Sequence, residues 1–197
     1  MIRIALDMMG GDNAPSSTVN GVIEFLNEQS NISEYNDSIK LFLVGIKEDI
    51  KSVLVNHPTI LEKVEIVNAS QIVDYKDRPS RIIKTKPDSS MNVSINLLNE
   101  GKVDAVVSAG NTGCLLASSF FNLGMIEGIK RPALFAFIPS ENGNFLICDV
   151  GANSSAKSIH LLQFGGMASI YMQFQMKINQ PKIGLLNIGS EENKGND

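Results

Sequence analysis

Short apolar segments that alternate with helical patterns constrain the fold of this chain more than any other feature. Each segment has the length of a buried strand, and a polar or glycine-rich turn follows it. Between the segments apolar residues recur about every 3.6 positions, as in Val19, Val22, Ile23 and Leu26, which predicts amphipathic helices. Strands that alternate with helices favour parallel pairing. The sequence therefore predicts an α/β fold, an open, mostly parallel doubly wound sheet with helices on both faces, with strands at 2–6, 39–44, 64–67, 103–107 and 182–186.

The third quarter of the chain departs from this alternation. Two apolar runs, 133–138 and 145–150, are joined by a polar turn at 141–144, which predicts an antiparallel hairpin within the sheet. The helix that follows, to about Met176, is apolar on most sides and is therefore expected to be buried, as at a subunit interface. A length of 197 residues fits a single α/β domain over residues 1–197.

Charge and cysteine content exclude several classes of function. The net charge of −4 and the pI of about 5.2 give no bulk attraction to nucleic acid or to anionic lipid. Cys114 and Cys148 lie in apolar surroundings without metal-ligand spacing, which is typical of a reduced cytosolic protein. Asp7 interrupts the first apolar run, so no signal peptide is predicted, and no apolar pattern reaches the length of a membrane span. We expect a soluble cytoplasmic protein with no nucleic-acid partner and no metal site.

The segment Ser-Ala-Gly-Asn-Thr-Gly at 108–113 has the composition of an anion-binding loop. It follows a predicted strand and precedes a predicted helix, where glycines allow close backbone approach and free N–H groups attract negative charge. It is neither a Walker A loop nor Gly-x-Gly-x-x-Gly, so an ordinary tight connection is the alternative. The candidate phosphate-binding residues here are Ser108, Gly110, Asn111, Thr112 and Gly113.

Three other predicted strand ends carry similar residues. In an open α/β sheet such ends share one edge, so their side chains are expected to converge on one crevice. For the first loop the alternatives are a metal site, caps of the turn, or orientation of a cation. These strand ends add the candidates Asp7, Gly10, Gly11, Asp12, Asp149, Asn153, Asn187 and Asn196.

Residues 76–86 include five basic side chains in eleven positions. The pattern indicates either a solvated helix face or a docking patch for an acidic partner or an anionic substrate tail, formed by Arg78, Arg81, Lys84 and Lys86. Next, Ser89 and Ser90 cap a helix that ends at Gly101, and their hydroxyls would add a second phosphate-binding helix terminus.

These motifs together resemble the PlsX family of bacterial phosphate acyltransferases. The resemblance rests on residues 7–12, 88–91, 108–113, 149–153, 160–164 and 184–197, in that family's order and spacing. It implies an enzyme that makes acyl phosphate from acyl-[acyl carrier protein] and inorganic phosphate for phospholipid synthesis. It also implies a fold like that of phosphotransacetylase and isocitrate dehydrogenase, a homodimer, and no cofactor.

The resemblance suggests roles for individual residues. We expect Ser108, Gly110, Asn111 and Thr112 to hold phosphate, which attacks the thioester without a covalent enzyme intermediate. Lys194 would supply positive charge at the reacting centre. His160 would polarise the carbonyl or protonate the leaving thiolate, with a structural cap of its helix as the alternative. Three further residues would shape the pocket, namely Asp7, Asp12 and Asn153.

Three departures from the family pattern stand out. The family continues well beyond Asp197, with a further active-site element and hydrophobic helices linked to peripheral membrane contact, so this chain is expected to be truncated and to have little or no activity. Ser155 and Ser158 replace the usual Asp and Pro, and Cys114 replaces a small apolar residue. The alternatives are a phosphotransacetylase-like enzyme, with 76–86 binding the phosphates of coenzyme A, and a non-catalytic phosphate-binding module.

Overall fold

A computed structural model describes residues 1–31, 38–141, 143–187 and 189 of the chain. Residue contacts group the chain into two compact units, residues 1–124 and residues 125–197. The sequence predicts a single domain over residues 1–197, and that stays a prediction.

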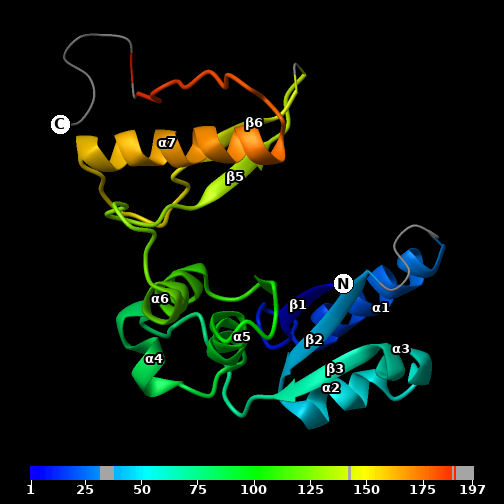
Figure 1. The fold of residues 1–197 in the computed structure, drawn as a ribbon. Helices are drawn as coiled ribbons and strands as arrows, with labels where there is room; N and C mark the ends of the chain where they lie inside the picture. The colour runs from blue at the N-terminus through cyan, green and yellow to red at the C-terminus, as the bar shows by residue number, and fades with distance from the viewer. Residues whose placement is uncertain (32–37, 142, 188, 190–197) are drawn as a thin grey trace. The chain divides into compact units, whose positions relative to one another are not determined.

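A four-stranded parallel sheet forms the centre of the first unit (Figure 1). Its strand order is β3-β2-β1-β4, so the first strand of the chain lies inside the sheet. Asp7, the last residue of β1, pairs with Ser108, the last residue of β4. The predicted parallel α/β sheet is thus confirmed for β1 (Ile2–Asp7), β2 (Ile39–Gly45), β3 (Val64–Asn68) and β4 (Ala105–Ser108).

Helices cover both faces of this sheet. The first face carries α1 (Ser16–Asn31) and α2 (Lys47–Leu54), and α3 (Pro58–Lys63) packs against α2 and β3. The sequence interpretation missed α3, because Pro58 looked like a loop residue, whereas it occupies the first turn of a helix. On the other face α5 (Ser90–Asn99) packs against β1, β2 and β4, and α6 (Thr112–Leu123) packs against α5. Between β3 and α5 lie the short helices η1 (Pro79–Arg81) and α4 (Ile82–Thr85).

The alternation of side chains along β1 explains why both faces need helices. Leu6 packs with the cluster that includes Val22 of α1, whereas its neighbour Ala5 packs with the cluster that includes Leu97 of α5. Successive residues of a strand point to opposite faces, so a strand that is apolar throughout is stable only when both faces are covered.

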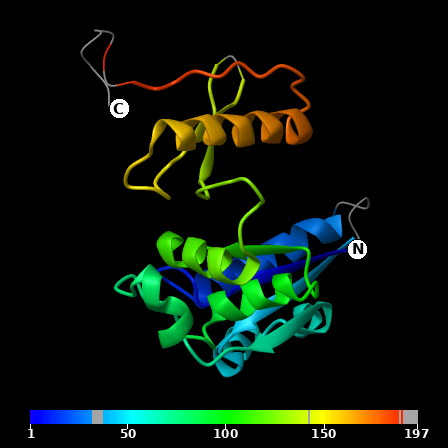
Figure 2. The same ribbon diagram turned by 60° about the vertical axis from the view of Figure 1, so that its left-hand side comes forward.

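The second unit consists of an antiparallel strand pair and one long helix, seen from two sides in Figures 1 and 2. The predicted hairpin is confirmed as β5 (Phe135–Ile138) and β6 (Phe145–Cys148), but it forms a separate two-stranded sheet, so its expected place within the main sheet is wrong. The helix α7 (Ser158–Gln175) lies across this pair, where the ring of Tyr171 packs 5.7 Å from that of Phe135 and 5.6 Å from that of Phe137.

A further expectation for the second unit, the strand at 182–186, is wrong. Residues 181–187 form no strand in the described chain, and Leu185 and Leu186 are 76% and 90% exposed. An apolar run becomes a strand only beside another strand that satisfies its backbone groups, and sequence does not supply that neighbour. Along α7, Leu162 and Phe174 are 72% and 69% exposed in the part of the chain that the structure describes, so burial of this helix at a subunit interface stays a prediction.

Candidate functional site

Asp7 is the centre of the candidate site in the first unit. Its side chain is 4% exposed, and three donors converge on it from three segments of the chain. Ser90 Oγ donates to Asp7 Oδ1 at 2.5 Å, Met9 N donates to the same oxygen at 3.3 Å, and Ser108 Oγ donates to Oδ2 at 2.7 Å. A buried carboxylate needs such donors to offset the loss of its hydration. The carboxylate of β1 therefore fixes the end of β4 and the start of α5.

The glycines of the two loops allow the loops to touch. A Cβ atom on Gly10 would lie 2.7 Å from the amide nitrogen of Gly110 and 2.8 Å from Asp7 Oδ2, distances that no side chain tolerates. Gly110 N in turn donates to Ser108 Oγ at 3.1 Å. The backbones of residues 7–10 and 108–110 thus pack directly against each other, and this close approach requires glycine.

The loop ends in the N-terminus of α6, which is open to an anion. Asn111 is the N-cap, and its Oδ1 accepts from Cys114 N at 3.0 Å. The amides of Thr112 and Gly113 are the first two of the helix and have no intrahelical acceptor, and Thr112 is exposed. These N–H groups and the positive end of the helix dipole can bind phosphate or carboxylate.

The basic segment, residues 76–86, and the residue before it contact the same helix terminus. Asn111 Nδ2 donates to Tyr75 O at 3.3 Å, Cys114 Sγ donates to Asp77 O at 3.6 Å, and Pro79 packs against Gly113. Burial and the nearby Asp77 raise the pKa of the Cys114 thiol, which opposes formation of a nucleophilic thiolate.

The four basic candidates of this segment differ in their surroundings. Lys86 Nζ lies 2.5 Å from Asp77 Oδ2 and 2.7 Å from Ile72 O, so its charge is already paired within the protein. Burial would raise the pKa of Asp77, but the hydrogen bonds from Lys86 and from Asp74 N, together with the charge of Lys86, outweigh it, and this pKa lies below its ordinary value. Arg78, Arg81 and Lys84 are exposed.

The two serines at the start of α5 point into the protein. Ser89 is the N-cap of α5, since its Oγ accepts from Asn92 N at 3.3 Å, and Ser90 binds Asp7. Both side chains are buried, at 0% and 1% exposure. In this arrangement the two hydroxyls stabilise the loop rather than face a ligand.

The second unit holds another group of the predicted residues. Asp149 accepts hydrogen bonds from Leu134 N, Ala152 N, Asn153 N and Asn153 Nδ2, at 2.8 to 3.1 Å. Burial would raise the pKa of Asp149, but these donors outweigh it and lower the pKa below its ordinary value. Asn153 Nδ2 also donates to Pro132 O at 2.9 Å, so the two side chains hold the turn after β6 together.

His160 lies in the first turn of α7 and is 7% exposed. Its Nδ1 accepts from Lys157 N at 3.1 Å, which is the capping contact that the sequence analysis gave as the alternative to catalysis. Burial, followed by the charges of Arg131, Lys157 and Lys130, lowers the pKa of His160. The imidazole is therefore neutral near pH 7, with its proton on Nε2.

The structure thus brings together only part of the predicted set. Asp7, Gly10, Ser108, Gly110 and the start of α6 form one site, while Gly11 and Asp12 lie exposed beside it. Asp149, Asn153, His160 and the exposed Asn187 belong to the second unit, and their convergence with the first site stays a prediction. Lys194 and Asn196 lie outside the described residues.

Sequence reasoning missed Asn92, which joins the elements around the loop. Asn92 is 2% exposed, donates to Lys86 O at 2.7 Å and accepts from Ser118 Oγ at 2.6 Å. An amide among the apolar residues of a predicted helix was the available signal, because buried amides bind specific partners. Sequence reasoning also missed three residues of α1 that line a pocket against the sheet, Thr18, Gly21 and Phe25.

Among the described residues no group of three or more His, Cys, Asp or Glu side chains could hold a metal ion. None of the helices in the described part of the chain is long and apolar enough to cross a membrane.

Comparison with known proteins gives close relatives in sequence. The chain is 42% identical to a phosphate acyltransferase of Caldicellulosiruptor bescii over 196 residues, which are 100% of this chain and 57% of that protein. It is 45% identical to a phosphate acyltransferase of Dictyoglomus turgidum over 99% of this chain and 56% of the relative. The chain therefore spans slightly more than half the length of the curated relatives it matches.

Two solved structures share the fold. A phosphotransacetylase from Streptococcus pyogenes aligns with a TM-score of 0.62 at 13% identity, over 90% of this chain and 55% of that one. The EutD phosphotransacetylase from Staphylococcus aureus aligns with a TM-score of 0.56 at 14% identity, over 87% of this chain and 52% of that one. The expected likeness to the phosphotransacetylase fold is confirmed.

The family model described as "Fatty acid synthesis protein" matches residues 2–197, which is almost the whole chain. The relatives named above are phosphate acyltransferases, as the motifs around residues 7–12 and 108–113 predict. This chain therefore belongs to the fatty acid synthesis protein family, the family of the PlsX phosphate acyltransferases.

Proposed function

We propose that the chain carries the phosphate site of an acyltransferase that makes acyl phosphate from acyl-[acyl carrier protein] and inorganic phosphate, in fatty acid and phospholipid synthesis. The observation that carries the proposal is the open N-terminus of α6, held in place by Asp7 and Ser108. Relatives named phosphate acyltransferase support the reaction class.

Phosphate would bind at the start of α6. The amides of Thr112 and Gly113 and the hydroxyl of Thr112 are the donors that the loop leaves available. Ser108 has a different task, since its hydroxyl hydrogen is directed at Asp7 and its oxygen accepts from Gly110 N. We assign Ser108 to positioning of the loop and the helix terminus to binding of the anion.

The reaction requires little covalent chemistry from the protein. An oxygen of phosphate forms a bond to the thioester carbon, the carbon–sulfur bond breaks, and the thiolate leaves and takes up a proton. Holding the two reactants together can lower the barrier by about 7–11 kcal/mol, and fixed donors stabilise the oxyanion. In this scheme Lys194 supplies positive charge, and the Nε2–H of His160 polarises the carbonyl or protonates the thiolate.

The carrier protein would dock on Arg78, Arg81 and Lys84. These three side chains are exposed on a segment that contacts the start of α6, whereas Lys86 is paired with Asp77. A basic surface beside the anion site suits an acidic partner.

We also propose that the protein is a cytoplasmic homodimer without a redox cofactor. It would contact the membrane peripherally through the segment that other members of the family have after the position of Asp197. The exposed apolar side chains of α7, including Leu162, Ile170 and Phe174, are the surface that a second subunit would cover. Sedimentation of the chain at increasing concentration tests the dimer, which Ile170→Glu should weaken.

A phosphotransacetylase-like enzyme is the second candidate, favoured by the fold shared with two phosphotransacetylases. The basic segment would then bind the phosphates of coenzyme A. Rates with acyl-coenzyme A and acyl-[acyl carrier protein], measured at equal concentration, distinguish the two. A preference for the coenzyme A thioester would reject the carrier protein as the donor.

The first experiment measures phosphate-dependent loss of the acyl-[acyl carrier protein] thioester by the 197-residue chain and by a chain extended to the length of the relatives. Turnover by the extended chain alone would mean that a further segment completes the active site. Turnover by both would mean that the residues present suffice. If neither chain shows turnover although both are folded, the acyltransferase proposal fails.

A second experiment tests the phosphate site without turnover. Thr112→Pro removes the first amide N–H of α6, and proline is tolerated there because Asn111 already has a non-helical backbone, at φ −58° and ψ 111°. Calorimetric titration with inorganic phosphate should show at least tenfold weaker binding. The matched control is Ser158→Pro at the start of α7, which should bind phosphate as the original chain does. Unchanged binding in Thr112→Pro would place the phosphate elsewhere.

A further inference from the structure

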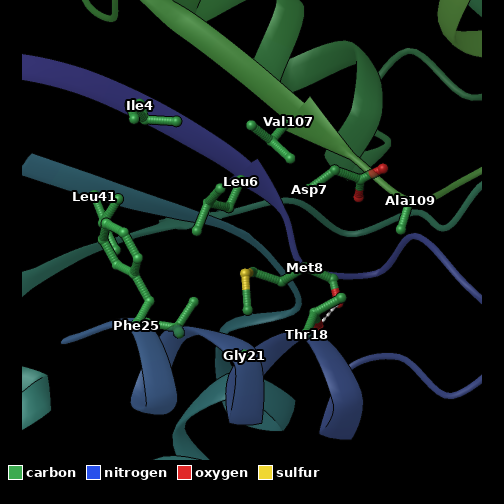
Figure 3. A pocket seen from close by; sticks show the side chains of 11 residues that line it. Ile4, Leu6, Asp7, Met8, Thr18, Gly21, Phe25, Leu41, Val107 and Ala109 are labelled. Atoms are coloured by element: carbon green, nitrogen blue, oxygen red, sulfur yellow. Dashed lines mark hydrogen bonds between the residues drawn. The ribbon is translucent and has the colours of Figure 1, made fainter. Parts of the chain in front are cut away.

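An open apolar groove lies between the sheet and α1 in the first unit, with a volume of about 330 Å³ (Figure 3). Its sheet wall includes Leu6 of β1, Leu41 of β2 and Val107 of β4, and its helix wall includes Gly21 and Phe25 of α1. All of these residues belong to the first unit.

The groove has a polar end and an apolar end. In Figure 3 Asp7 and Ala109 lie at one end, whereas Phe25 and Leu41 lie at the other. Ala109 belongs to the loop that precedes α6, so the polar end lies beside the proposed phosphate site. From Asp7 back to Ile4 the groove follows β1 for three residues, a length of roughly 10 Å.

The walls of the groove offer no polar group that a ligand would have to satisfy. Thr18 has the one hydroxyl among the lining side chains, and it donates to Met8 O at 2.7 Å and lies 2.9 Å from Pro15 O. Both carboxylate oxygens of Asp7 already accept hydrogen bonds from the protein. A ligand with its own donors and acceptors would leave them unpaired here, whereas an alkyl chain has none.

We propose that this groove binds the alkyl chain of the acyl donor, with the acyl carbonyl beside Ala109 and the chain running along β1 toward Phe25. This inference rests on the proposed acyltransferase function and adds to it the site of the lipid tail. The carbonyl must meet phosphate at the start of α6, so the tail must leave from near that point, and the groove reaches Ala109, three residues before the first residue of α6. Each methylene removed from water favours binding by about fourfold.

Gly21 allows the groove to be filled without strain. A Cβ atom at Gly21 would meet nothing within 4 Å, and the same is true of Gly166 in α7 of the second unit. Gly21→Leu therefore places an isobutyl group in the groove, and Gly166→Leu makes the same change on another helix as the matched control. Val107→Glu, at a position 56% exposed, places a charge in the groove, and Val55→Glu, at a position 67% exposed, makes the same change outside the groove as its control.

The test is a fluorescence titration of the folded 197-residue chain with the long-chain fatty acid cis-parinaric acid. We expect saturable binding, at least tenfold weaker in Gly21→Leu and Val107→Glu, and within twofold of the original in both controls. Absence of saturable binding to the original chain would overturn the proposal. The proposal would also be overturned if neither Gly21→Leu nor Val107→Glu weakened fatty-acid binding. If Gly21→Leu does not fold, the result for Val107→Glu decides the test.

Failure of this inference and failure of the proposed function are distinguishable. In the thioester assay with the extended chain, donors of four and sixteen carbons are compared for the original and for Gly21→Leu. The groove proposal expects the variant to lose rate with the long donor and to keep it with the short donor. Equal loss with both would reject the groove as the tail site, whereas no turnover with any donor would reject the acyltransferase function.

Discussion

At Asp7 the hydroxyls of Ser90 and Ser108 and the amide of Met9 converge on a single buried carboxylate. Asp7→Asn keeps the shape of the side chain but replaces one acceptor with a donor that faces a serine hydroxyl. We expect the free energy of unfolding to fall by about 1–3 kcal/mol, because a buried polar group is left without its partner. Urea unfolding followed by circular dichroism measures this loss.

The control for this change is Asp12→Asn, because Asp12 lies exposed in the same loop. Its effect should stay within about 0.5 kcal/mol, as is usual for surface substitutions. Equal stability of the two variants would show that the hydrogen bonds of Asp7 do not stabilise the loop.

Asp149 makes the second unit sensitive to acid. Its pKa in the folded chain is lowered by the donors Leu134 N, Ala152 N and Asn153, so its stabilising effect is complete above the unfolded pKa, near 3.9. This effect is lost as the pH falls below that value through the folded pKa. We expect the melting temperature of the original chain to drop more steeply below about pH 4 than that of Asp149→Asn. Parallel curves for the two chains would contradict the prediction.

At the scale of elements, Asn111 both caps α6 and fastens the basic segment through Tyr75 O. Asn111→Asp keeps an acceptor for Cys114 N, so α6 should remain capped, but it adds negative charge where phosphate would bind. Asn111→Ala should lower the free energy of unfolding by about 1 kcal/mol through loss of the cap.

Thermal unfolding and phosphate titration together separate these two effects. Asn111→Asp should melt close to the original chain and bind phosphate at least tenfold more weakly, since the added charge repels the anion. Unchanged phosphate affinity in Asn111→Asp would argue against an anion site at the start of α6.

At the scale of the whole molecule, the three hydrophobic clusters of the described chain all lie in residues 4–117. The second unit buries few large apolar side chains, among them Phe164 and Met172. We expect residues 1–124 expressed alone to fold and melt cooperatively, because their core is complete, and residues 125–197 alone to unfold without a sharp transition. Circular dichroism is the suitable method, because the chain has no tryptophan. A non-cooperative melt of residues 1–124 would contradict this prediction.

The sequence was informative where local chemistry is sufficient. The apolar runs of β1, β2, β3 and β4 and the helix cap Ser89 follow from periodicity and from residues that act over a few positions, whereas the anion site at 108–113 stays a prediction. The expected strand at 182–186 failed because pairing depends on a neighbouring strand, which periodicity does not specify. Periodicity also does not predict the partners of Ser90 and Lys86, which bind Asp7 and Asp77 in the folded chain.

The sequence by itself thus determined the α/β class, the parallel pairing of the strands of the first sheet, and the family, and it predicts the loop at 108–113 as an anion site. Only the tertiary structure decided that Asp7 holds Ser90 and Ser108 together, that the hairpin forms its own sheet, and that a groove runs from Ala109 to Phe25. The physical reason is the separation in sequence of the residues that make each contact. Helix and strand patterns arise from contacts within a few residues, whereas a buried carboxylate network and a groove need side chains about a hundred positions apart to meet, as Asp7 and Ser108 do with a separation of 101 residues.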